Sequence, residues 1–556
     1  MIGFIKRHWA NIVFGMMLLL FLIYAGIFIY QSSVVVGGQR YFILFDDAMI
    51  SMQYARNLAH GNGLVWIAGG PRVEGITNPL WTIYMAFFHL FPIPTSTISI
   101  CLQISGAIFL LLNLYFVKKI TELLTDNNQI LVLLAVILCA FYYPLNQWAL
   151  LGLEVSILTM ITSLVTWRVL KNLKEGKFSI WIYLMLGVST LVRMDMLVLG
   201  LATLGFLVIV DAPNRKKHLL IGTLVLVGFM AGQTLARYLY YGDVLPNTYY
   251  LKMTGSPLLL RLARGASVFF KFVWNGNIVL MLFPLMVFLF RRDKATFYLL
   301  LAFLAQVAYS IYIGGDAWEH RGGSNRFFSN AMPLFFILFI LCCEKLRQAI
   351  VKQVSADGAS LKLERMRSFS YLGVAVFVFY SLVSFNTLLD TTSLQYAFLQ
   401  KPSIYTVGEE KSVTIAQFIN DTTTSNATVA IHAAGIIEYL TDREAFDVLG
   451  KSDKLIAHEP MHIPPDQPLI DFRPGHNKWD YAYTIGVLKP DVIIEVFDGT
   501  IADAYPYLAD YRCIEPVTLK RRLSYGAMFV RTDSPNFFWD KKSLYNIATC
   551  PTPSSN

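Results

Sequence analysis

Long apolar runs recur along the chain from the amino terminus to about residue 389. Each is close to 20 residues, enough for a helix to cross a hydrocarbon core about 30 Å thick. The pattern therefore predicts a polytopic α-helical membrane protein over residues 1–389. Eleven crossings are predicted, near residues 10–30, 97–117, 129–145, 153–170, 179–192, 196–210, 219–238, 276–291, 296–313, 331–346 and 369–388.

One further apolar segment, 79–92 (PLWTIYMAFFHLFP), is short and begins and ends in proline, so we expect it to enter the membrane only partway. With it left out, all basic clusters fall on one side, which is the positive-inside pattern. The amino terminus is then cytoplasmic, and the C-terminal part lies outside. The clusters are Lys6/Arg7, Lys118/Lys119, Arg168 to Lys177, Arg215 to Lys217, Arg291 to Lys294 and Lys345 to Arg367.

Composition agrees with a membrane class. Of the 556 residues, 55% are hydrophobic and 15% charged, and the mean hydropathy is +0.51; soluble domains carry about 25% charged residues. The net charge of +9 comes mostly from the short loops, so we expect no nucleic-acid partner. The first span lacks a small-residue cleavage site and exceeds a signal core in length, so we do not expect a cleavable signal peptide.

Beyond Asp390, polar residues, prolines and short β-rich runs replace the long apolar stretches. Thr428 to His432 and Val492 to Val496 are predicted to be buried strands, with a short helix over Ala434 to Leu440. We therefore expect a compact extracytoplasmic α/β domain over 390–556. Its two cysteines, Cys513 and Cys550, are compatible with one disulfide in an oxidising compartment, but spacing alone does not decide this.

The three outer loops, 31–78, 239–275 and 314–330, hold nearly all the unusual residues. In the first, apolar residues from Phe45 to Ala59 recur at spacings of three and four, which predicts an amphipathic helix along the membrane surface. Asp46 and Asp47 stand at its start. One interpretation is an N-cap that satisfies free backbone amides. The other is a carboxylate that takes a proton from an acceptor hydroxyl.

Charged residues also interrupt the spans. Arg193 and Asp195 lie inside the apolar stretch 179–210, where each charge costs a few kcal/mol to insert. They form either a local ion pair in a short outer turn or a site in which the cation faces a phosphate. Glu154 opens another span as a boundary residue or as part of the same site.

The second and third loops combine glycine with polar groups. LPNTYYLK places Asn247, Tyr249 and Lys252 just outside a span. GGDAWEHRGGSNRFF carries the charged residues Asp316, His320, Arg321 and Arg326 among four glycines. Glycine lets backbone approach a ligand closely, and Arg suits bidentate phosphate binding. The third loop is therefore predicted to be a ligand site.

The string FDDAMISMQYARNLAHGNGLVWIAGGPRVEGITNPLW resembles the first outer loop of the mycobacterial terminal arabinofuranosyltransferases (AftB-type), which are GT-C glycosyltransferases. NTYYLK and GGDAWEHRGGSNRFF resemble that group's later outer loops, and AFDVLGKSD, PGHNK and KPDVII resemble the start of its C-terminal domain. The islands occur in the right order over most of the chain. The sequence departs where Ile67 and Ala68 follow Trp66, since many relatives have Asn-Pro there, and in HRGGSN of the third loop.

The resemblance implies a lipid-linked donor, commonly decaprenyl-phosphoryl-arabinofuranose, and a glycan, lipid or protein acceptor on the periplasmic side of a bacterial plasma membrane. It maps the essential carboxylate onto Asp46. The chain has no nucleotide-binding fingerprint, so no cofactor is expected, and a divalent metal is left open. Predicted donor-phosphate ligands are Arg193, Lys252 and Arg326. Predicted sugar-stacking residues are Trp66, Tyr249 and Trp318, each of which also suits an interfacial anchor. Further substrate-binding candidates are Glu74, Asn78, Glu154, Asp195, Asn247, Asp316, His476 and Lys478.

A transporter or flippase of a lipid-linked sugar is the alternative function. Such a protein would also have many spans and buried charge, but it more often has paired repeats or broken helices in matching halves. The sequence contains no internal repeat. The long acidic outer loop and the large outer domain therefore favour a transferase.

Overall fold

The computed structural model describes residues 2–318, 325–355, 360–388, 392–463, 468, 472–521 and 523–552. The chain forms two compact units. The first comprises Met1–Gln31, Gln103–Gly232 and Leu259–Pro402. The second comprises Ser32–Leu102, Gln233–Leu258 and Ser403–Asn556, so it joins the first outer loop to the C-terminal residues.

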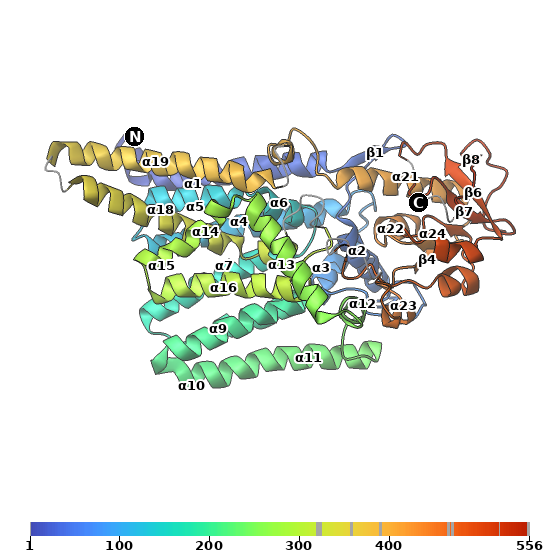
Figure 1. The fold of residues 1–556 in the computed structure, drawn as a ribbon, viewed down its shortest axis with the longest axis horizontal. Helices are drawn as coiled ribbons and strands as arrows, with labels where there is room; N and C mark the ends of the chain where they lie inside the picture. Colours follow the sequence, from blue (N-terminus) through green and yellow to red (C-terminus); the bar gives the residue numbers. More distant parts are fainter. Residues whose placement is uncertain are drawn as a thin grey trace. The chain divides into compact units, whose positions relative to one another are not determined.

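The first unit is helical, and its long helices run roughly parallel to one another (Figure 1). α16 packs against α9 and α18, and α18 also packs against α5 and α19. The helices are α1 (Ile2–Gln31), α4 (Ser99–Leu124), α5 (Gln129–Ala140), α6 (Tyr143–Leu150), α7 (Val155–Glu175), α8 (Trp181–Val192), α9 (Leu197–Val210), α10 (Arg215–Lys217), α11 (Thr223–Tyr241), α13 (Leu258–Asn275), α14 (Ile278–Leu282), α15 (Val287–Phe290), α16 (Lys294–Tyr312), α17 (Arg326–Ser329), α18 (Met332–Ser355), α19 (Ser360–Thr387) and α20 (Ser393–Ala397). α4 begins, and α11 ends, in the second unit.

Each of the eleven predicted spans contains helix. Among the described helices, five are long and apolar enough to cross a membrane alone, and two bent helix pairs raise the number to seven. α8 and α9 have 12 and 14 residues, so the count of eleven crossings remains a prediction. The excluded segment forms α3 (Pro79–His89), whose 11 residues reach only about 16 Å at 1.5 Å per residue. That length is too short to cross the core.

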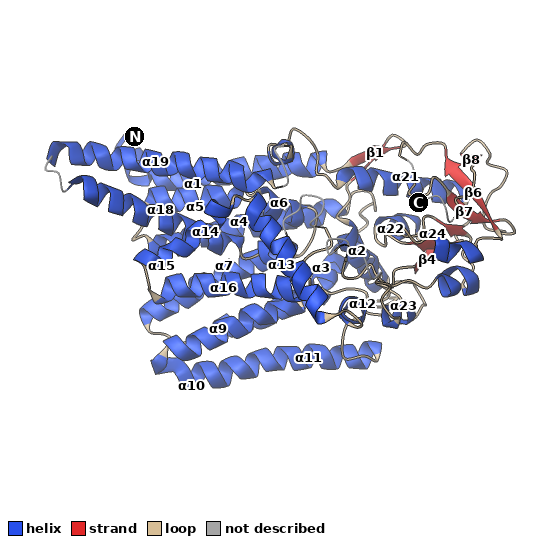
Figure 2. Cartoon of the chain, viewed as in Figure 1, coloured by secondary structure: helices blue, strands red, loops and turns tan. Residues whose placement is uncertain are grey.

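The second unit combines helices with two sheets, whose strands are red in Figure 2. Its helices are α2 (Asp46–Ala59), α3, α12 (Asn247–Met253), α21 (Thr406–Thr422), α22 (Ile436–Thr441), α23 (Lys454–His458) and α24 (Ile501–Ala504). Its strands are β1 (Val34–Val36), β2 (Gln39–Tyr41), β3 (Thr428–Ile431), β4 (Glu444–Asp447), β5 (Val492–Ile493), β6 (Tyr511–Pro516), β7 (Met528–Arg531) and β8 (Tyr545–Ile547).

The larger sheet has the order β4-β3-β5-β7-β6-β8. β3 pairs in parallel with β4 and β5, and the remaining pairs are antiparallel. β3 confirms the first predicted strand. The second is shorter than predicted, since only Val492 and Ile493 pair with β7, although the whole stretch is buried.

Alternate strand residues face opposite sides of a sheet, and two cores follow from this. Val429 and Val492 belong to one core, Ala430 and Ile493 to the other. The first core also contains Tyr54 and other residues of the first outer loop. The first outer loop thus packs as part of the sheet domain. The sequence analysis instead placed a single domain boundary near residue 390.

This packing corrects the prediction for the helix after Phe45. Ala48 through Asn57 are all buried, including Gln53 and Arg56. The segment α2 therefore has no exposed polar face with which to lie along a membrane surface. α3 and α22 both pack against it.

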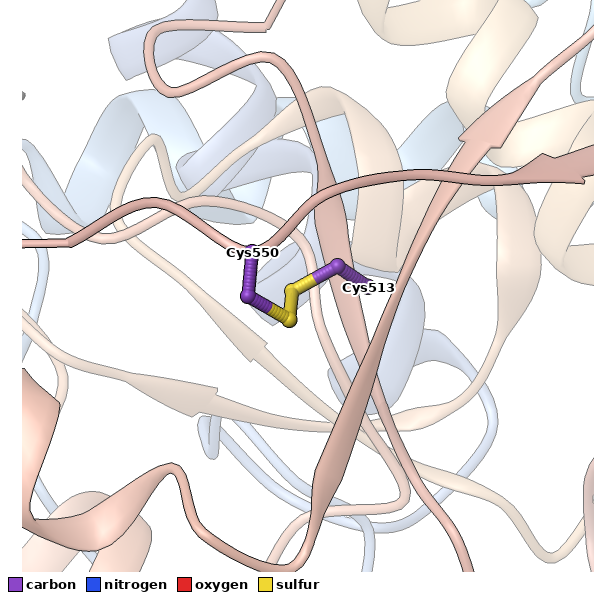
Figure 3. The surroundings of a disulfide bond; sticks show 2 residues. All are labelled: Cys513 and Cys550. Atoms are coloured by element: carbon purple, nitrogen blue, oxygen red, sulfur yellow. A yellow bond between two sulfur atoms is a disulfide. The ribbon is translucent and has the colours of Figure 1, made fainter.

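Cys513 and Cys550 form a disulfide with a Cα–Cα distance of 5.2 Å (Figure 3). The bond ties β6 to the segment that follows β8. The remaining cysteines, Cys101, Cys139, Cys342 and Cys343, all lie within the described residues and form no disulfide there.

Candidate functional site

The acidic pair lies at the first turn of α2. The N-cap position is Phe45, whose side chain makes no capping hydrogen bond, and the helix begins at Asp46 itself. Oδ1 of Asp46 instead accepts a hydrogen bond from the backbone N–H of Ile436 at 3.3 Å. The preceding Gly435 has φ +148°, and a Cβ there would collide with the main-chain oxygen of Asp46. The structure therefore does not support the N-cap interpretation of this pair.

Asp47 faces a lysine of the C-terminal sheet domain. Nζ of Lys451 lies 3.3 Å from Oδ1 of Asp47, and the lysine is 9% exposed. The loop after β4 presents this lysine. Asp447 fixes the conformation of this loop, since its carboxylate accepts hydrogen bonds from the backbone N–H groups of Leu449 at 3.1 Å and Ser452 at 2.8 Å.

Asn247, which was predicted to bind substrate, contacts the main chain of this loop. Its side-chain Nδ2 donates to the carbonyl oxygens of Gly450, Lys451 and Asp453 at 2.9, 3.0 and 3.1 Å. Asn247 is buried at the start of α12. Its described contacts therefore fix the main chain that carries Lys451.

His476 and Lys252 complete the cluster. The side chain of Lys252 packs against the backbone next to His476. A Cβ added to Gly475 would lie 3.1 Å from Cε of Lys252. Burial, the largest cause, lowers the pKa of His476 to about 3, and the charges of Lys451, Lys252 and Arg473 add to this while Asp47 opposes it. His476 is therefore neutral at physiological pH.

Asp46 has the ionisation that suits a base. Burial, the largest cause, raises the pKa of Asp46 to about 7, and the charges of Asp47 and Asp447 add to the rise. Lys451 and the N–H of Ile436 oppose it. A carboxyl group that titrates near the working pH can both take up and release a proton.

Two further carboxyl groups surround Asp46. Glu409 on α21 and Glu438 on α22 are buried, and the carboxyl oxygens of Glu409 have no hydrogen-bond partner among the described residues. Burial, and next the charge of Asp46, raise both pKa values well above the ordinary value. Both carboxyl groups therefore keep their protons to a higher pH than an exposed glutamate does.

Two residues of the first outer loop that were predicted to bind substrate, Trp66 and Asn78, have structural contacts. Trp66 lies in the sheet core and donates from Nε1 to the carbonyl of Ala445 at 2.8 Å. Oδ1 of Asn78 accepts hydrogen bonds from the hydroxyls of Ser51 at 2.9 Å and Thr82 at 3.1 Å. These contacts leave Trp66 no open ring face for stacking on a sugar.

Glu74 forms a buried ion pair with Arg237 near the end of α11. Lys478 donates from Nζ to the carbonyls of Tyr250 at 3.0 Å and Ala457 at 2.8 Å, and is fully buried. These contacts favour structural roles for Glu74 and Lys478. Tyr249, by contrast, is 41% exposed and remains a candidate for stacking.

The remaining predicted residues form a buried cluster in the first unit. Nη1 of Arg193 lies 2.8 Å from Glu154, and its Nε lies 3.0 Å from Asp195. Arg326 pairs with Asp316 at 3.0 Å. Both guanidinium groups face the ring of Phe327 (Arg193, 4.8 Å; Arg326, 5.6 Å). The ion pair between Arg193 and Asp195 is thus present, as the first interpretation expects, and the interpretation in which the cation faces a phosphate stays a prediction.

The predicted third-loop residues His320 and Arg321 lie outside the described residues. Trp318 lies within them and is partly buried. Among the residues that the structure describes, no group of three His, Cys, Asp or Glu side chains is arranged to hold a metal ion.

The structure thus brings together Asp46, Asp47, Lys252 and His476 from three distant parts of the sequence. It adds Lys451, Asp447, Glu409 and Glu438, for which the sequence analysis gave no role. Asp447 and Lys451 both belong to AFDVLGKSD. That motif pointed to this segment but carried no sign of which side chains face the acidic pair.

Comparisons with known proteins agree with this fold. Residues 402–535 match a family described as a domain of unknown function (DUF8728). A search of curated proteins finds no match.

Solved structures are similar over nearly the whole chain. ArnT from Cupriavidus metallidurans bound to undecaprenyl phosphate has 11% identity and a TM-score of 0.54, covering 93% of this chain and 98% of that chain. The oligosaccharyltransferase of Archaeoglobus fulgidus in the apo form has 12% identity and a TM-score of 0.54, covering 96% and 75%. AglB from Archaeoglobus fulgidus, in complex with an inhibitory peptide and a dolichol-phosphate, has 10% identity and a TM-score of 0.51, covering 95% and 75%. At these identities the likeness shows the fold alone: a polytopic α-helical membrane protein of the GT-C type with a C-terminal sheet domain.

Proposed function

We propose that this chain is a glycosyltransferase that moves a sugar, with arabinofuranose as the first candidate, from a polyprenyl-phosphate donor to a glycan, lipid or protein acceptor. The observation that carries the proposal is the acidic pair at the start of α2. Asp46 there has a pKa near 7 and lies among carboxyl groups, a neutral His476 and the lysines of two other segments. The AftB-type resemblance of this loop supports the choice of sugar.

The solved structures of this fold support the donor class. ArnT from Cupriavidus metallidurans was solved with undecaprenyl phosphate, and AglB from Archaeoglobus fulgidus with dolichol-phosphate. The Archaeoglobus oligosaccharyltransferase was also solved tethered to an acceptor peptide. A lipid-linked donor and an acceptor outside the lipid are therefore reasonable substrates for a chain with this architecture.

The reaction follows from the charges of the site. Asp46 accepts the proton of the acceptor hydroxyl, and the acceptor oxygen forms a bond to the anomeric carbon. The bond between that carbon and the phosphate oxygen breaks, and the polyprenyl phosphate leaves with the electron pair. Lys252 and Arg473 are the cations we assign to the charge that grows on the leaving phosphate. Arg193 and Arg326 are already paired with carboxylates, so we assign them to the structure of the first unit.

We further propose that the second unit lies on the outer face of a bacterial plasma membrane. The distribution of basic loops supports this orientation. The disulfide between Cys513 and Cys550 also supports it, because disulfides persist in oxidising compartments.

A transfer assay tests the function. The purified protein in nanodiscs is incubated with radiolabelled polyprenyl-phosphoryl arabinofuranose or mannose and an arabinan oligosaccharide, and labelled product is measured. We expect transfer from the arabinose donor, and we expect it to be lost in Asp46→Asn. A protein that carries the labelled lipid across a vesicle membrane but forms no glycoside would instead be a transporter, and the proposal would be wrong.

A further inference from the structure

We propose that Lys451 is a positioning residue of the same reaction centre: its ammonium group orients Asp47 and keeps the acidic pair in the carboxylate form needed to accept a proton. This inference rests on the proposed function for its kinetic consequence. It assigns to the C-terminal sheet domain a direct part in the chemistry of the first outer loop.

The first argument is the geometry of the contact. Nζ of Lys451 lies 3.3 Å from Oδ1 of Asp47, and the side chains are 11% and 22% exposed. Charges in so dry a site interact far more strongly than at a surface. A lone buried lysine would be costly, so its place beside the carboxylates needs a reason.

The second argument is the way the loop is held. The turn that carries Lys451 receives three hydrogen bonds from Asn247 and gives two to Asp447. Gly450 has φ +76°, and a Cβ there would lie 2.8 Å from Ile456. A flexible surface lysine needs none of these restraints. The main chain that carries the lysine is therefore fixed by contacts within the protein.

The third argument is the charge balance around Asp46. The groups that face it are one cation and four carboxyl groups from four elements or their adjoining loops: Lys451, Asp47, Asp447, Glu438 and Glu409. Burial lowers the pKa of Lys451, but Asp47, Asp46 and Asp447 together raise it above the ordinary value. The lysine therefore stays charged, and it is the group whose removal would most favour protonation of Asp46.

The sign of the effect is fixed by this balance. Lys451 lowers the pKa of Asp46, whereas burial, Asp47 and Asp447 raise it. Without the lysine, Asp46 would be protonated over a wider pH range. Lys451 is the largest single influence that lowers the pKa of Asp46, and an opposite charge next to a carboxyl group is worth about 1–3 units, so we expect a rise of about one unit or more.

The test compares Lys451→Met with Lys252→Met, a matched loss of the other lysine of the cluster. In Lys451→Met the acidic limb of the kcat/KM profile should move to higher pH by about one unit. Lys252 is not among the main causes of the Asp46 pKa shift, so Lys252→Met should move the limb much less than Lys451→Met does and should raise the KM for donor. Lys451→Arg keeps the charge and should restore most of the wild-type limb.

A second measurement does not depend on catalysis. Dicyclohexylcarbodiimide modifies protonated carboxyl groups, so mass spectrometry of the peptide that contains Asp46 gives a pH for half-modification. This midpoint should rise in Lys451→Met and stay unchanged in Lys252→Met. An unmoved midpoint and an unmoved limb in folded Lys451→Met would overturn the inference. If the wild-type protein transfers no sugar but the midpoint still rises in Lys451→Met, the proposed function is refuted and the role of Lys451 stays in place.

Discussion

The backbone N–H of Ile436 donates a hydrogen bond to Oδ1 of Asp46, 390 residues earlier in the chain. The first outer loop and the C-terminal domain therefore share one polar site within the second unit. Asp47 makes the parallel contact with Lys451, 404 positions away. Two neighbouring acidic residues are thus held by two different segments of the sheet domain. Changes in that domain should consequently alter the chemistry of Asp46 without touching its own loop.

Asp46→Asn should reduce turnover at least about a hundredfold while leaving expression and folding near normal, because Asn is nearly isosteric and a general base is worth about 10²–10⁴-fold. In the wild-type protein, kcat/KM should fall below pH about 7, where Asp46 takes up its proton. The measurement is the pH profile of the transfer assay together with the thermal unfolding temperature of each variant.

Asp47→Asn is the internal control for this prediction. It keeps Asp46 but loses the ion pair with Lys451, so its loss of turnover should be smaller. Normal turnover in Asp46→Asn would contradict the assignment and direct the search for the base to Asp47.

The sequence predicted the helices of the first unit because a run of about 20 apolar residues leaves few alternatives in a membrane. It failed for α2, whose polar residues Gln53 and Arg56 are buried. Gln53 donates to the carbonyl of Trp66, and Arg56 to the carbonyl of Tyr439 and the carboxylate of Asp442. The spacing of apolar residues within one segment cannot predict partners as distant in sequence as Tyr439 and Asp442. It shows only where polar residues occur in that segment.

The same limit explains the candidate site. The acidic pair stood out because two adjacent carboxylates at a helix start are unusual. Glu409, Glu438 and Lys451 had no predicted role, since nothing in their neighbouring sequence marks burial. Conversely, Trp66 and Asn247 were predicted to bind substrate, but their hydrogen bonds go to the chain itself. Only tertiary contacts separate these two groups of residues.

The ion pair between Glu74 and Arg237 should be needed for stability rather than for catalysis. Both side chains are almost completely buried, and removal of one partner of a buried pair costs about 3–5 kcal/mol. Glu74→Gln should therefore lower the unfolding temperature measured by scanning fluorimetry. The double variant Glu74→Gln/Arg237→Met should lower the unfolding temperature by less than the sum of the decreases in Glu74→Gln and Arg237→Met. A stable Glu74→Gln that has lost donor binding would instead support the predicted substrate role.

The disulfide between Cys513 and Cys550 should stabilise the sheet domain. The residues are 37 positions apart, and closing a loop of this length reduces the entropy of the unfolded chain by an amount worth about 4 kcal/mol. Cys513→Ala/Cys550→Ala should therefore unfold at a lower temperature, and reduction of the wild-type protein should have a similar effect. Cys101→Ala removes a cysteine of the same unit that forms no disulfide in the described structure and should respond to reductant like the wild type. An unfolding temperature that is insensitive to reductant would contradict the prediction.

Glu409 and Glu438 should make the protein less stable as the pH rises. Their pKa values in the folded protein are well above the ordinary value because both are buried, and the charge of Asp46 adds to the rise. The unfolded chain releases these protons near pH ~4.3, whereas the folded protein keeps them to higher pH. Since the folded state then binds more protons, its stability falls as the pH rises from about 4.3 toward the folded pKa values. Gln mimics the protonated form and cannot ionise, so Glu409→Gln/Glu438→Gln should fold normally and lose part of this dependence. The measurement is the unfolding temperature of wild type and double variant at pH 6 and pH 8. The difference in unfolding temperature between pH 6 and pH 8 should be smaller in the variant than in the wild type. An equal difference would mean that both groups are already ionised in the folded protein.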